Sequence, residues 1–435
     1  IMPSLVGSEM CIRDRYYKHM KTANDILKAI PADATDAALK KYRGQALASR
    51  AFDYLQLIQT YQLTYIGHET ANGVPLVLET TSDTELMNNP RASVQQVYSR
   101  IMEDLDEAIT LLTGASARAD KAEISVEVAY GLRARANLLM GKWSAAASDA
   151  AKAYGTSAPY SIADVSQPTF YNATDNSWIW GIVVTTEDYL AKTGIVNWPS
   201  NLCSLTGMGY TTAASATDVA YRLINKNLWA KIPETDVRKG WWVDEDLHSP
   251  VLDNGLGEDY AYYWANGMFN GGTFPSKFSP YTNVKFGPDN GTFADTDNAQ
   301  DWPLMRVEEM KLIEAEALGR DNLAAGKQKL EEFVRQYRDP SYTCTAGSLD
   351  AFIDEVWFQR RVELWGEGFA LFDILRLKKP IIRQGANYPI NSTFAEIAAE
   401  APIMIYRIPE AETSVNSAIT EADNNPAAMA PTPVN

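Results

Sequence analysis

Aromatic side chains and planar polar side chains are concentrated in the middle of the sequence, between residues 156 and 302. This stretch holds eight of the eleven tryptophans, at positions 178, 180, 198, 229, 241, 242, 264 and 302. Aromatic rings stack on the apolar C–H faces of pyranose rings, whereas Asn, Asp, Gln and Arg side chains form hydrogen bonds with hydroxyl groups. The pattern therefore predicts non-covalent binding of a polyhydroxylated ligand such as an oligosaccharide.

Three groups of residues in this stretch are candidate ligand contacts. The Trp241–Trp242 pair is followed closely by acidic residues, and a second run, 260–266, is rich in tyrosine. Trp178 and Trp180 are two positions apart, so in a strand they share one face. An earlier loop, 64–90, adds further candidates. The candidate set is Trp241, Trp242, Tyr262, Trp264, Trp178, Trp180, Tyr65 and Asn72.

Each of these aromatic residues has an alternative role in the protein core, because Trp and Tyr are often buried on average. Neighbours in an extended segment point in opposite directions, so we expect one of Trp241 and Trp242 to face inward. Trp229 lies in a helical stretch and is assigned to the core. If the assignment of the site is correct, replacing Trp241, Trp242 and Trp264 together by Ala abolishes glycan binding and leaves the fold intact.

Motifs for catalysis and for metal binding are absent from the sequence. There is no C-x-x-C, H-x-x-x-H, P-loop or G-x-S-x-G, and no Ser or Cys stands in a sequence context that pairs a nucleophile with a His base. Carboxylates such as Asp244 and Glu258 occur, but no spacing marks an acid/base pair, and no EF-hand pattern supports calcium. We expect no enzyme activity, no cofactor and no metal site. A bridge between Cys203 and Cys344 is left open.

The composition is that of a globular protein with an acidic surface. The chain has 435 residues and a formal net charge of −16, which argues against nucleic-acid binding because phosphate neutralisation needs clustered Lys and Arg. No run of about 18 apolar residues is present, so no membrane-spanning helix is predicted.

Apolar residues recur at helical spacing in both terminal parts of the chain. The spacing predicts helices over 16–30, 36–62, 93–113, 126–140, 143–154, from 303 onward, 323–338, 349–366 and 369–378, and a shorter one near 217–232. Small and aromatic residues in 126–154 resemble a tetratricopeptide unit, with a generic alanine-rich hairpin as the alternative. We predict a mostly α fold, a tetratricopeptide-like scaffold built from both chain ends with a loop-rich, aromatic-rich insertion.

The first fifteen residues, IMPSLVGSEMCIRDR, resemble a peptide translated from sequencing-adapter DNA, and they contain no signal peptide and no lipobox before Cys11. We interpret residues 1–15 as non-native and expect the native start to be missing. The remainder, 16–435, is predicted to be a single domain in which 16–155 and 303–422 form the scaffold and 156–302 a variable ligand-binding insertion.

Six segments stand out in order along the chain. They are ALASRAFDYLQLIQTY at 46–61 with GVPLV at 73–77, the helix at 93–112, the hairpin at 129–146, PLMRVEEMKLIEAEA at 303–317, RRVELWGEG at 360–368 with FDILR at 372–376, and Ile408-Pro409 with Glu412, Asn416 and Asn424-Asn-Pro426. Together they resemble the SusD/RagB family of outer-membrane nutrient-binding lipoproteins of Bacteroidetes. Asn replaces the family's more usual Gln before the final Asn-Pro.

The resemblance implies a non-catalytic protein on the cell surface. Such proteins are tethered to the outer membrane by an N-terminal lipid, cover a SusC-like TonB-dependent transporter, and capture glycans, or in some members peptides, for import. The alternatives are a peptide-capturing or purely scaffolding repeat protein of the same complex and, less favoured, a helical glycoside hydrolase. The resemblance carries over no ligand-contacting residue, because the family varies in this middle region.

Overall fold

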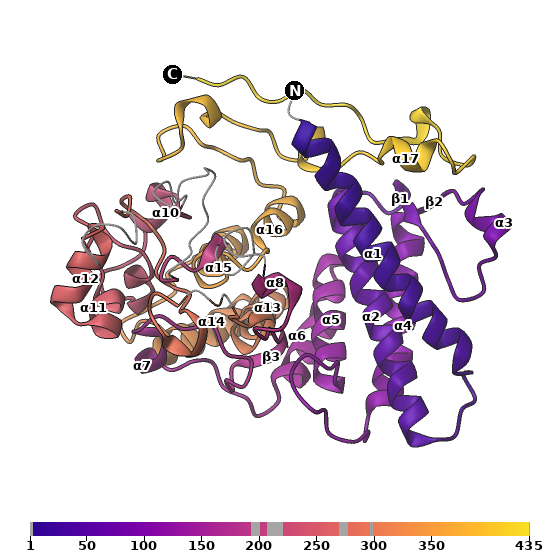
Figure 1. The fold of residues 1–435 in the computed structure, drawn as a ribbon, viewed down its shortest axis with the longest axis horizontal. Helices are drawn as coiled ribbons and strands as arrows, with labels where there is room; N and C mark the ends of the chain where they lie inside the picture. Colours follow the sequence, from indigo (N-terminus) through magenta and orange to yellow (C-terminus); the bar gives the residue numbers. More distant parts are fainter. Residues whose placement is uncertain are drawn as a thin grey trace.

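The computed structural model describes residues 3–192, 201–206, 221–268, 277–295, 297 and 299–434. Within these residues the protein is mostly helical, as predicted (Figure 1). The principal helices of the scaffold are α1 (Pro3–Ala29), α2 (Ala37–Tyr61), α4 (Val94–Leu112), α5 (Val126–Leu139), α6 (Trp143–Tyr154), α13 (Val307–Asp321), α14 (Leu323–Tyr337), α15 (Leu349–Glu363) and α16 (Ala370–Arg376).

Helix α4 shows how local sequence sets these boundaries. Its apolar residues at intervals of three and four are buried, and they pack on α2. The N-cap Ser93 accepts a hydrogen bond from the backbone N–H of Gln96, and the Gln96 side chain accepts one from the backbone N–H of Ser93. The predicted capping box is thereby confirmed.

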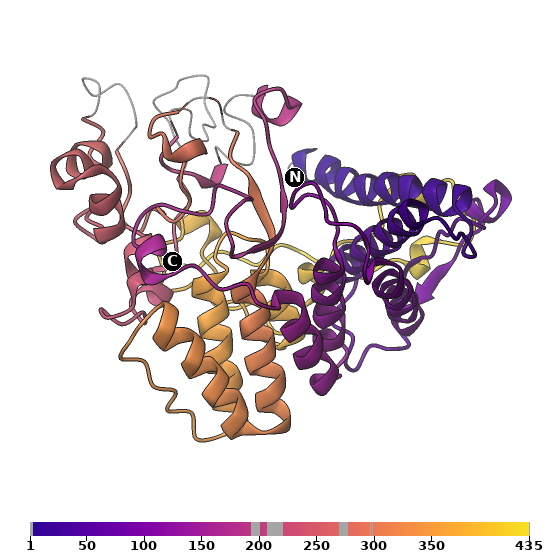
Figure 2. The same cartoon turned by 90° about the horizontal axis from the view of Figure 1, so that it is seen from below.

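Helices from the two ends of the chain pack directly against each other. Helix α6 lies along α13, with α5 and α14 on the outer sides (Figure 2). The Tyr154 hydroxyl donates to Glu314 at 2.9 Å, and the Arg135 guanidinium donates to Glu309 at 2.6 Å. The prediction that both chain ends build one scaffold is confirmed.

The crossing of α13 and α14 depends on two glycines that face each other. A Cβ atom on Gly326 would lie 2.3 Å from the Gly319 Cα atom and 2.8 Å from the Ala315 carbonyl oxygen. Both neighbours are backbone atoms, so no side chain can move aside to make room for it. The pair therefore sets the distance between the two helix axes.

The substitution Gly326→Ala is expected to lower the free energy of unfolding by about 3 kcal/mol, the upper end of the range for overpacking. Gly347→Ala is the matched control, because its added Cβ meets nothing within 4 Å. Urea denaturation of both variants measures the difference. Equal stabilities would show that the α13–α14 crossing tolerates a wider separation.

Two short sheets join distant parts of the chain. Strand β1 (Asn72–Pro75) pairs with β2 (Arg91–Ser93), and β3 (Trp178–Ile182) pairs with β4 (Trp302–Arg306), both antiparallel. The helix predicted from residue 303 begins only at Val307. That boundary was wrong because the preceding residues form the ladder that attaches the insertion to the scaffold.

The insertion contains short elements around a second hydrophobic core. Its elements are α7 (Ile162–Val165), α8 (Tyr189–Lys192), α10 (Lys226–Trp229), η1 (Val237–Trp241), α11 (Pro250–Leu256), α12 (Glu258–Ala265) and η3 (Asp289–Gly291). Of the helix predicted near 217–232, residues 217–220 lie outside the described residues, and α10 is the helical part of the rest. Cys203 and Cys344 are free and buried in two different hydrophobic clusters, so they do not form a bridge.

A buried network of charged side chains lies between the insertion core and the scaffold. Glu363 accepts hydrogen bonds from Arg338 at 2.8 Å, from Arg306 at 3.3 Å and from Arg238 at 3.4 Å, and all four side chains are buried. Burial by itself would raise the pKa of Glu363, but the guanidinium groups outweigh it and hold that pKa well below its usual value. Nearby, burial lowers the pKa of Lys285 to about 8.

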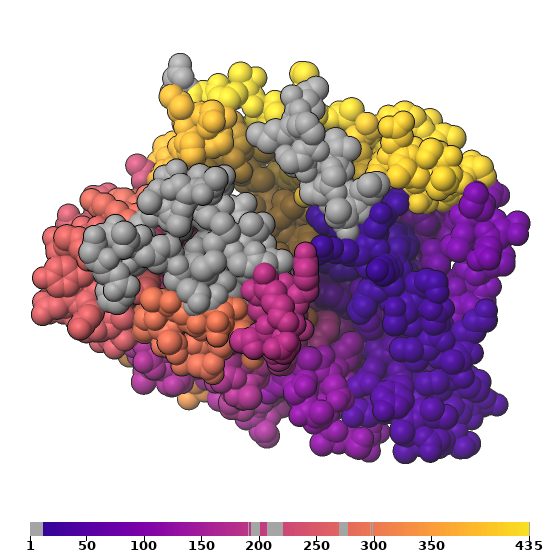
Figure 3. Space-filling view, in the orientation of Figure 1, coloured from indigo at the N-terminus to yellow at the C-terminus, as the bar shows by residue number. Residues whose placement is uncertain are grey.

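The C-terminal residues, yellow in Figure 3, run across both parts of the molecule. Asn387 donates to the Ile224 carbonyl in the insertion, and Asn425 donates to the Tyr61 carbonyl at the end of α2. The C-terminal segment contains the short elements η4 (Ile390–Ser392), η5 (Pro402–Met404), α17 (Glu410–Thr413) and η6 (Glu421–Asp423). One further short helix, α3 (Asp83–Leu86), lies in the 64–90 loop. None of the helices in the described ranges is long and apolar enough to cross a bilayer.

Candidate functional site

Five of the eight predicted ligand contacts are core residues. Trp241, Trp242, Trp264 and Trp178 are at most 1% exposed, and Trp180 is 7% exposed. The Trp241 indole N–H donates to the Val165 carbonyl oxygen at 3.0 Å. Because a ring enclosed by protein presents no face to a sugar in solution, the prediction that these five rings form an accessible stacking surface is wrong. Both members of the Trp241–Trp242 pair face inward.

Trp178 and Trp180 were predicted to share one face of a strand, and this prediction is wrong. The register of the β3–β4 ladder shifts between these two residues, so the simple alternation of a strand is lost. Trp178 packs in the core of the insertion, whereas Trp180 packs in the scaffold core, 5.0 Å from the Phe52 ring. The same strand therefore contributes one ring to the core of the insertion and one ring to the core of the scaffold.

Tyr65 and Asn72 belong to the scaffold and not to the insertion. Figure 1 places β1, which starts at Asn72, and α12 at opposite ends of the molecule. The half-buried Tyr65 ring packs edge-on against Tyr98, 4.9 Å between centroids. Asn72 and Tyr262 therefore lie on separate parts of the molecule, and ligand contact at Tyr65 and Asn72 stays a prediction.

The remaining candidate, Tyr262, belongs to an exposed aromatic surface on α12. Tyr260, Tyr262 and Tyr263 are 60%, 47% and 50% exposed. The ring of the exposed His248 lies 6.4 Å from that of Tyr262, and the two planes are tilted by only 32°. We call this set of four residues the α12 face. The helix positions them because Ala261, Trp264 and Ala265 on its other side are buried.

A hollow of about 440 Å³ adjoins the α12 face, with His248 in its wall. The half-buried Trp229 also lines it, and Lys239 lies 4.5 Å from the centroid of that ring. Another lining residue, Trp242, has an indole N–H with no hydrogen-bond partner in the described part of the chain. The sequence assigned Trp229 to the core and gave no role to His248, because only the folding of α10, η1 and α11 brings these residues together.

Carboxylates surround this hollow and the α12 face. Asp244 accepts hydrogen bonds from the backbone N–H groups of Asp246 and His248, both at 2.9 Å. Burial, followed by the hydrogen bond to Glu245, raises the pKa of Tyr281 to about 12. The arrangement offers exposed aromatic rings together with amide and carboxylate acceptors, which is the chemistry that hydroxyl-rich ligands require.

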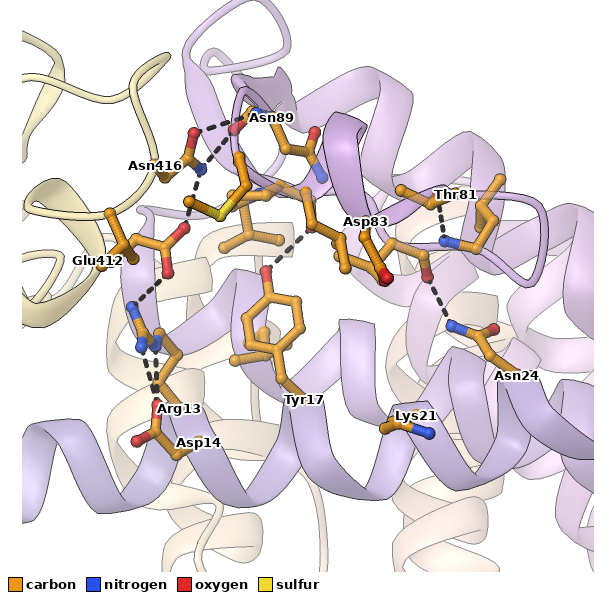
Figure 4. Close-up of a pocket in the computed structure, with 18 of the residues that line it drawn as sticks. Arg13, Asp14, Tyr17, Lys21, Asn24, Thr81, Asp83, Asn89, Glu412 and Asn416 are labelled. Atoms are coloured by element: carbon orange, nitrogen blue, oxygen red, sulfur yellow. Dashed lines mark hydrogen bonds and ion pairs between the residues drawn. The ribbon is translucent and has the colours of Figure 1, made fainter.

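A second hollow, of about 600 Å³, lies between α1, the 74–89 loop and α17 (Figure 4). Several of its polar groups are bonded within the protein. The Tyr17 hydroxyl donates to the Pro75 carbonyl, and Asn89 N–H donates to Asn416. The surface left for a ligand is mainly apolar, and Arg13 and Asp14 from the first fifteen residues form part of its wall. Its apolar lining includes Leu57, Val74, Leu78, Leu86, Met87 and Val415.

Helices α1 and α2 bring together a serine, a histidine and an aspartate. His19 Nδ1 lies 2.9 Å from Asp53, and Ser49 Oγ lies 3.4 Å from His19 Nε2. Burial raises the pKa of Asp53 to about 6, and the hydrogen bond to Asp53 raises the pKa of His19. The sequence missed this contact because His19 and Ser49 are thirty positions apart.

This constellation lacks the other part of an acyl-transfer site, a pair of free donors for an oxyanion. Ser49 lies in the middle of α2, where backbone N–H groups are used by the helix. The nearby side-chain donors are also occupied: Gln45 donates to the Ile124 carbonyl and Thr22 to the Lys18 carbonyl. We interpret His19 as a structural hydrogen-bond partner of the buried Asp53 carboxylate. Over the described ranges, no group of three or more His, Cys, Asp or Glu residues is arranged to hold a metal ion.

The fold and the α12 face define a helical-repeat protein that carries an exposed aromatic surface on a loop-rich insertion. Two family models match the sequence: one described as "Starch-binding associating with outer membrane" matches residues 12–138, and one described as "SusD family" matches residues 210–426. Together they cover most of the chain. The protein belongs to the SusD/RagB family.

Solved structures with the same fold support this assignment. A SusD-like carbohydrate binding protein from Bacteroides vulgatus is 22% identical, with a TM-score of 0.74 over 95% of this chain and 84% of that chain. A SusD superfamily protein from Bacteroides thetaiotaomicron is 20% identical, with a TM-score of 0.73 over 95% and 85%. A laminarin binding SusD-like protein is 19% identical, with a TM-score of 0.58 over 95% and 84%. No curated protein matches the sequence.

Proposed function

We propose that the protein binds an oligosaccharide or polysaccharide at the α12 face and the adjoining hollow. The observation that carries the proposal is the distribution of exposed aromatic side chains. Among the described residues, four of the six exposed tyrosines are in the insertion, at 189, 260, 262 and 263, and only Tyr42 and Tyr388 lie elsewhere. Exposed aromatic residues gathered on the insertion favour glycan binding, whereas a gathering on the helical repeats would favour peptide binding.

The proposal extends to the cellular setting of this binding activity. We propose that the protein is held at the outer membrane by a lipid on its native N-terminus and delivers the glycan to a SusC-like TonB-dependent transporter. We propose that the carbohydrate is released chemically unchanged. The Ser49–His19–Asp53 contact has no oxyanion donors, and no pair among the carboxylates around the α12 face is identified as a general acid and a general base. The description of the first family model and the titles of the related structures support this setting.

Replacing Tyr262 and Tyr263 together by alanine is expected to weaken glycan binding at least about 10-fold. Each ring that stacks on a sugar contributes roughly 0.5–1.5 kcal/mol beyond its buried area, and 1.4 kcal/mol corresponds to a factor of ten. Affinity electrophoresis of residues 16–435 in gels containing individual polysaccharides, laminarin among them, measures the change.

Tyr42→Ala is the matched control, since Tyr42 is a similarly exposed tyrosine, 55% exposed, but lies on the scaffold helix α2. Circular dichroism spectra of all variants should remain unchanged. Full affinity of the Tyr262/Tyr263 double variant would move the binding site away from the α12 face. Shortened oligosaccharides after prolonged incubation would contradict a purely binding role.

A further inference from the structure

The charges around the α12 face are almost all negative. Glu258 and Asp259 in the first turn of α12 are exposed, as are Glu245 and Asp246 before α11. Asp253 is half-buried, and the neighbouring carboxylates of Glu258 and Asp244 contribute to raising its pKa after burial itself. Within the described ranges, these carboxylates form no salt bridge with Lys or Arg. The full set of carboxylates is Asp244, Glu245, Asp246, Asp253, Glu258 and Asp259.

The two cations in the wall of the hollow are already neutralised. Lys239 forms an ion pair with Glu234 and covers the Trp229 ring. The other, Arg338, is fully buried against Glu308 and Glu363. Among the described residues of the insertion, three exposed lysines form no salt bridge: Lys226, Lys231 and Lys277. Of these, Lys277 lies near the C-terminal end of α12, where the next residue bonds to the Ala265 carbonyl at 2.8 Å.

The amino-acid sequence shows that the rest of the insertion cannot reverse this balance. Residues 156–302 contain seventeen acidic and only eight basic side chains. The stretches 193–200, 207–220 and 269–276, which lie outside the described residues, contain Asp218 and no Lys or Arg. A carboxylate or sulfate group on a bound sugar would therefore meet more like charges than lysines, and like charges brought together at an interface oppose binding.

We propose that the α12 face selects uncharged glycans and rejects polymers that carry uronate or sulfate groups. This inference rests on the proposed carbohydrate-binding function. The hydroxyl groups of a neutral glycan donate hydrogen bonds to the carboxylates, so the acidic side chains that repel an anionic sugar serve as acceptors for a neutral one. The same residues thus supply both recognition and exclusion.

The test compares polymers with the same backbone and different charge. Affinity electrophoresis at pH 8, where free histidine is neutral, is run with two matched pairs, laminarin with sulfated laminarin and dextran with dextran sulfate. Three unmatched polymers widen the panel: arabinan, which is neutral, and polygalacturonate and chondroitin sulfate, which are anionic. We expect retardation by at least one neutral polymer, and an affinity for its charged form at least 10-fold lower at low salt. This difference should shrink as salt is added, because salt screens exposed charges.

The double variant Glu258→Gln/Asp259→Asn keeps two exposed side chains of similar size and removes two charges. We expect it to bind the charged form of the polymer more tightly than the unmodified protein does. Binding of a charged polymer as strongly as, or more strongly than, its neutral form by the unmodified protein would overturn the inference and leave carbohydrate binding standing. No retardation by any polymer, with folded protein, would overturn the proposed function and the inference with it.

Discussion

Replacing Trp241, Trp242 and Trp264 together by alanine is expected to unfold the insertion, not to remove a binding surface from a folded protein. All three side chains are at most 1% exposed, and the Trp241 and Trp242 rings are 6.1 Å apart in the same hydrophobic cluster. Truncating one buried tryptophan costs about 3–5 kcal/mol. Neighbouring sites are not additive, yet the combined loss approaches the roughly 5–15 kcal/mol that stabilises a whole protein.

Circular dichroism and urea denaturation of the triple variant measure this loss. The control is the Tyr262→Ala/Tyr263→Ala double variant, which changes the exposed side of the same helix, α12, that buries Trp264. We expect the control to unfold at the same urea concentration as the unmodified protein. A triple variant with native stability and no affinity for glycan would instead support the assignment made from the sequence.

Replacing Glu363 by alanine is expected to lower the free energy of unfolding by about 3–5 kcal/mol, the usual effect of removing one partner from a buried ion pair. Glu363 is shared by Arg238, Arg306 and Arg338, and all four side chains are buried. Its loss leaves three guanidinium groups with fewer acceptors in a medium where an unpaired charge is costly. Arg306 and Arg338 keep Glu308 as a partner, which prevents a still larger loss.

The comparison for this experiment is Glu187→Ala, which breaks the exposed ion pair of Glu187 and Lys192. Exposed pairs contribute little, so no measurable change in the unfolding midpoint is expected. If Glu363→Ala were as stable as Glu187→Ala, the network would not hold the insertion against the scaffold. Glu363→Gln, which keeps the size and one acceptor oxygen of the side chain, should fall between the two.

The helical scaffold could be predicted from the sequence because helix formation and amphipathic packing depend on local spacing. The predictions for 93–113, 126–140 and 143–154 each agree with the observed helices within about two residues. The predicted start of a helix at Pro303 was wrong for a non-local reason. Residues 302–306 pair with β3, more than a hundred positions earlier in the chain, so the helix begins only at Val307.

The binding surface could not be predicted in the same way. Trp264 and Tyr262 are two positions apart on one short helix, yet one is in the core and the other is in solvent. Composition correctly identified the insertion as aromatic-rich. Residue type alone, however, does not distinguish an aromatic ring in the core from one that stacks on a ligand. Large tryptophans fill the core of an insertion that has few long helices, whereas the three tyrosines of α12 are exposed on its surface.

The sequence by itself therefore determined the family, the helical scaffold from both chain ends, and the acidic, aromatic-rich character of the insertion. These properties follow from local periodicity, ordered motifs and composition. Only the tertiary structure decided which rings are accessible, that Asn72 in β1 lies at the end of the molecule opposite α12, and that His248 and Trp229 border one hollow beside α12. The physical reason is that exposure and proximity depend on contacts between segments far apart in the chain, which local spacing does not record.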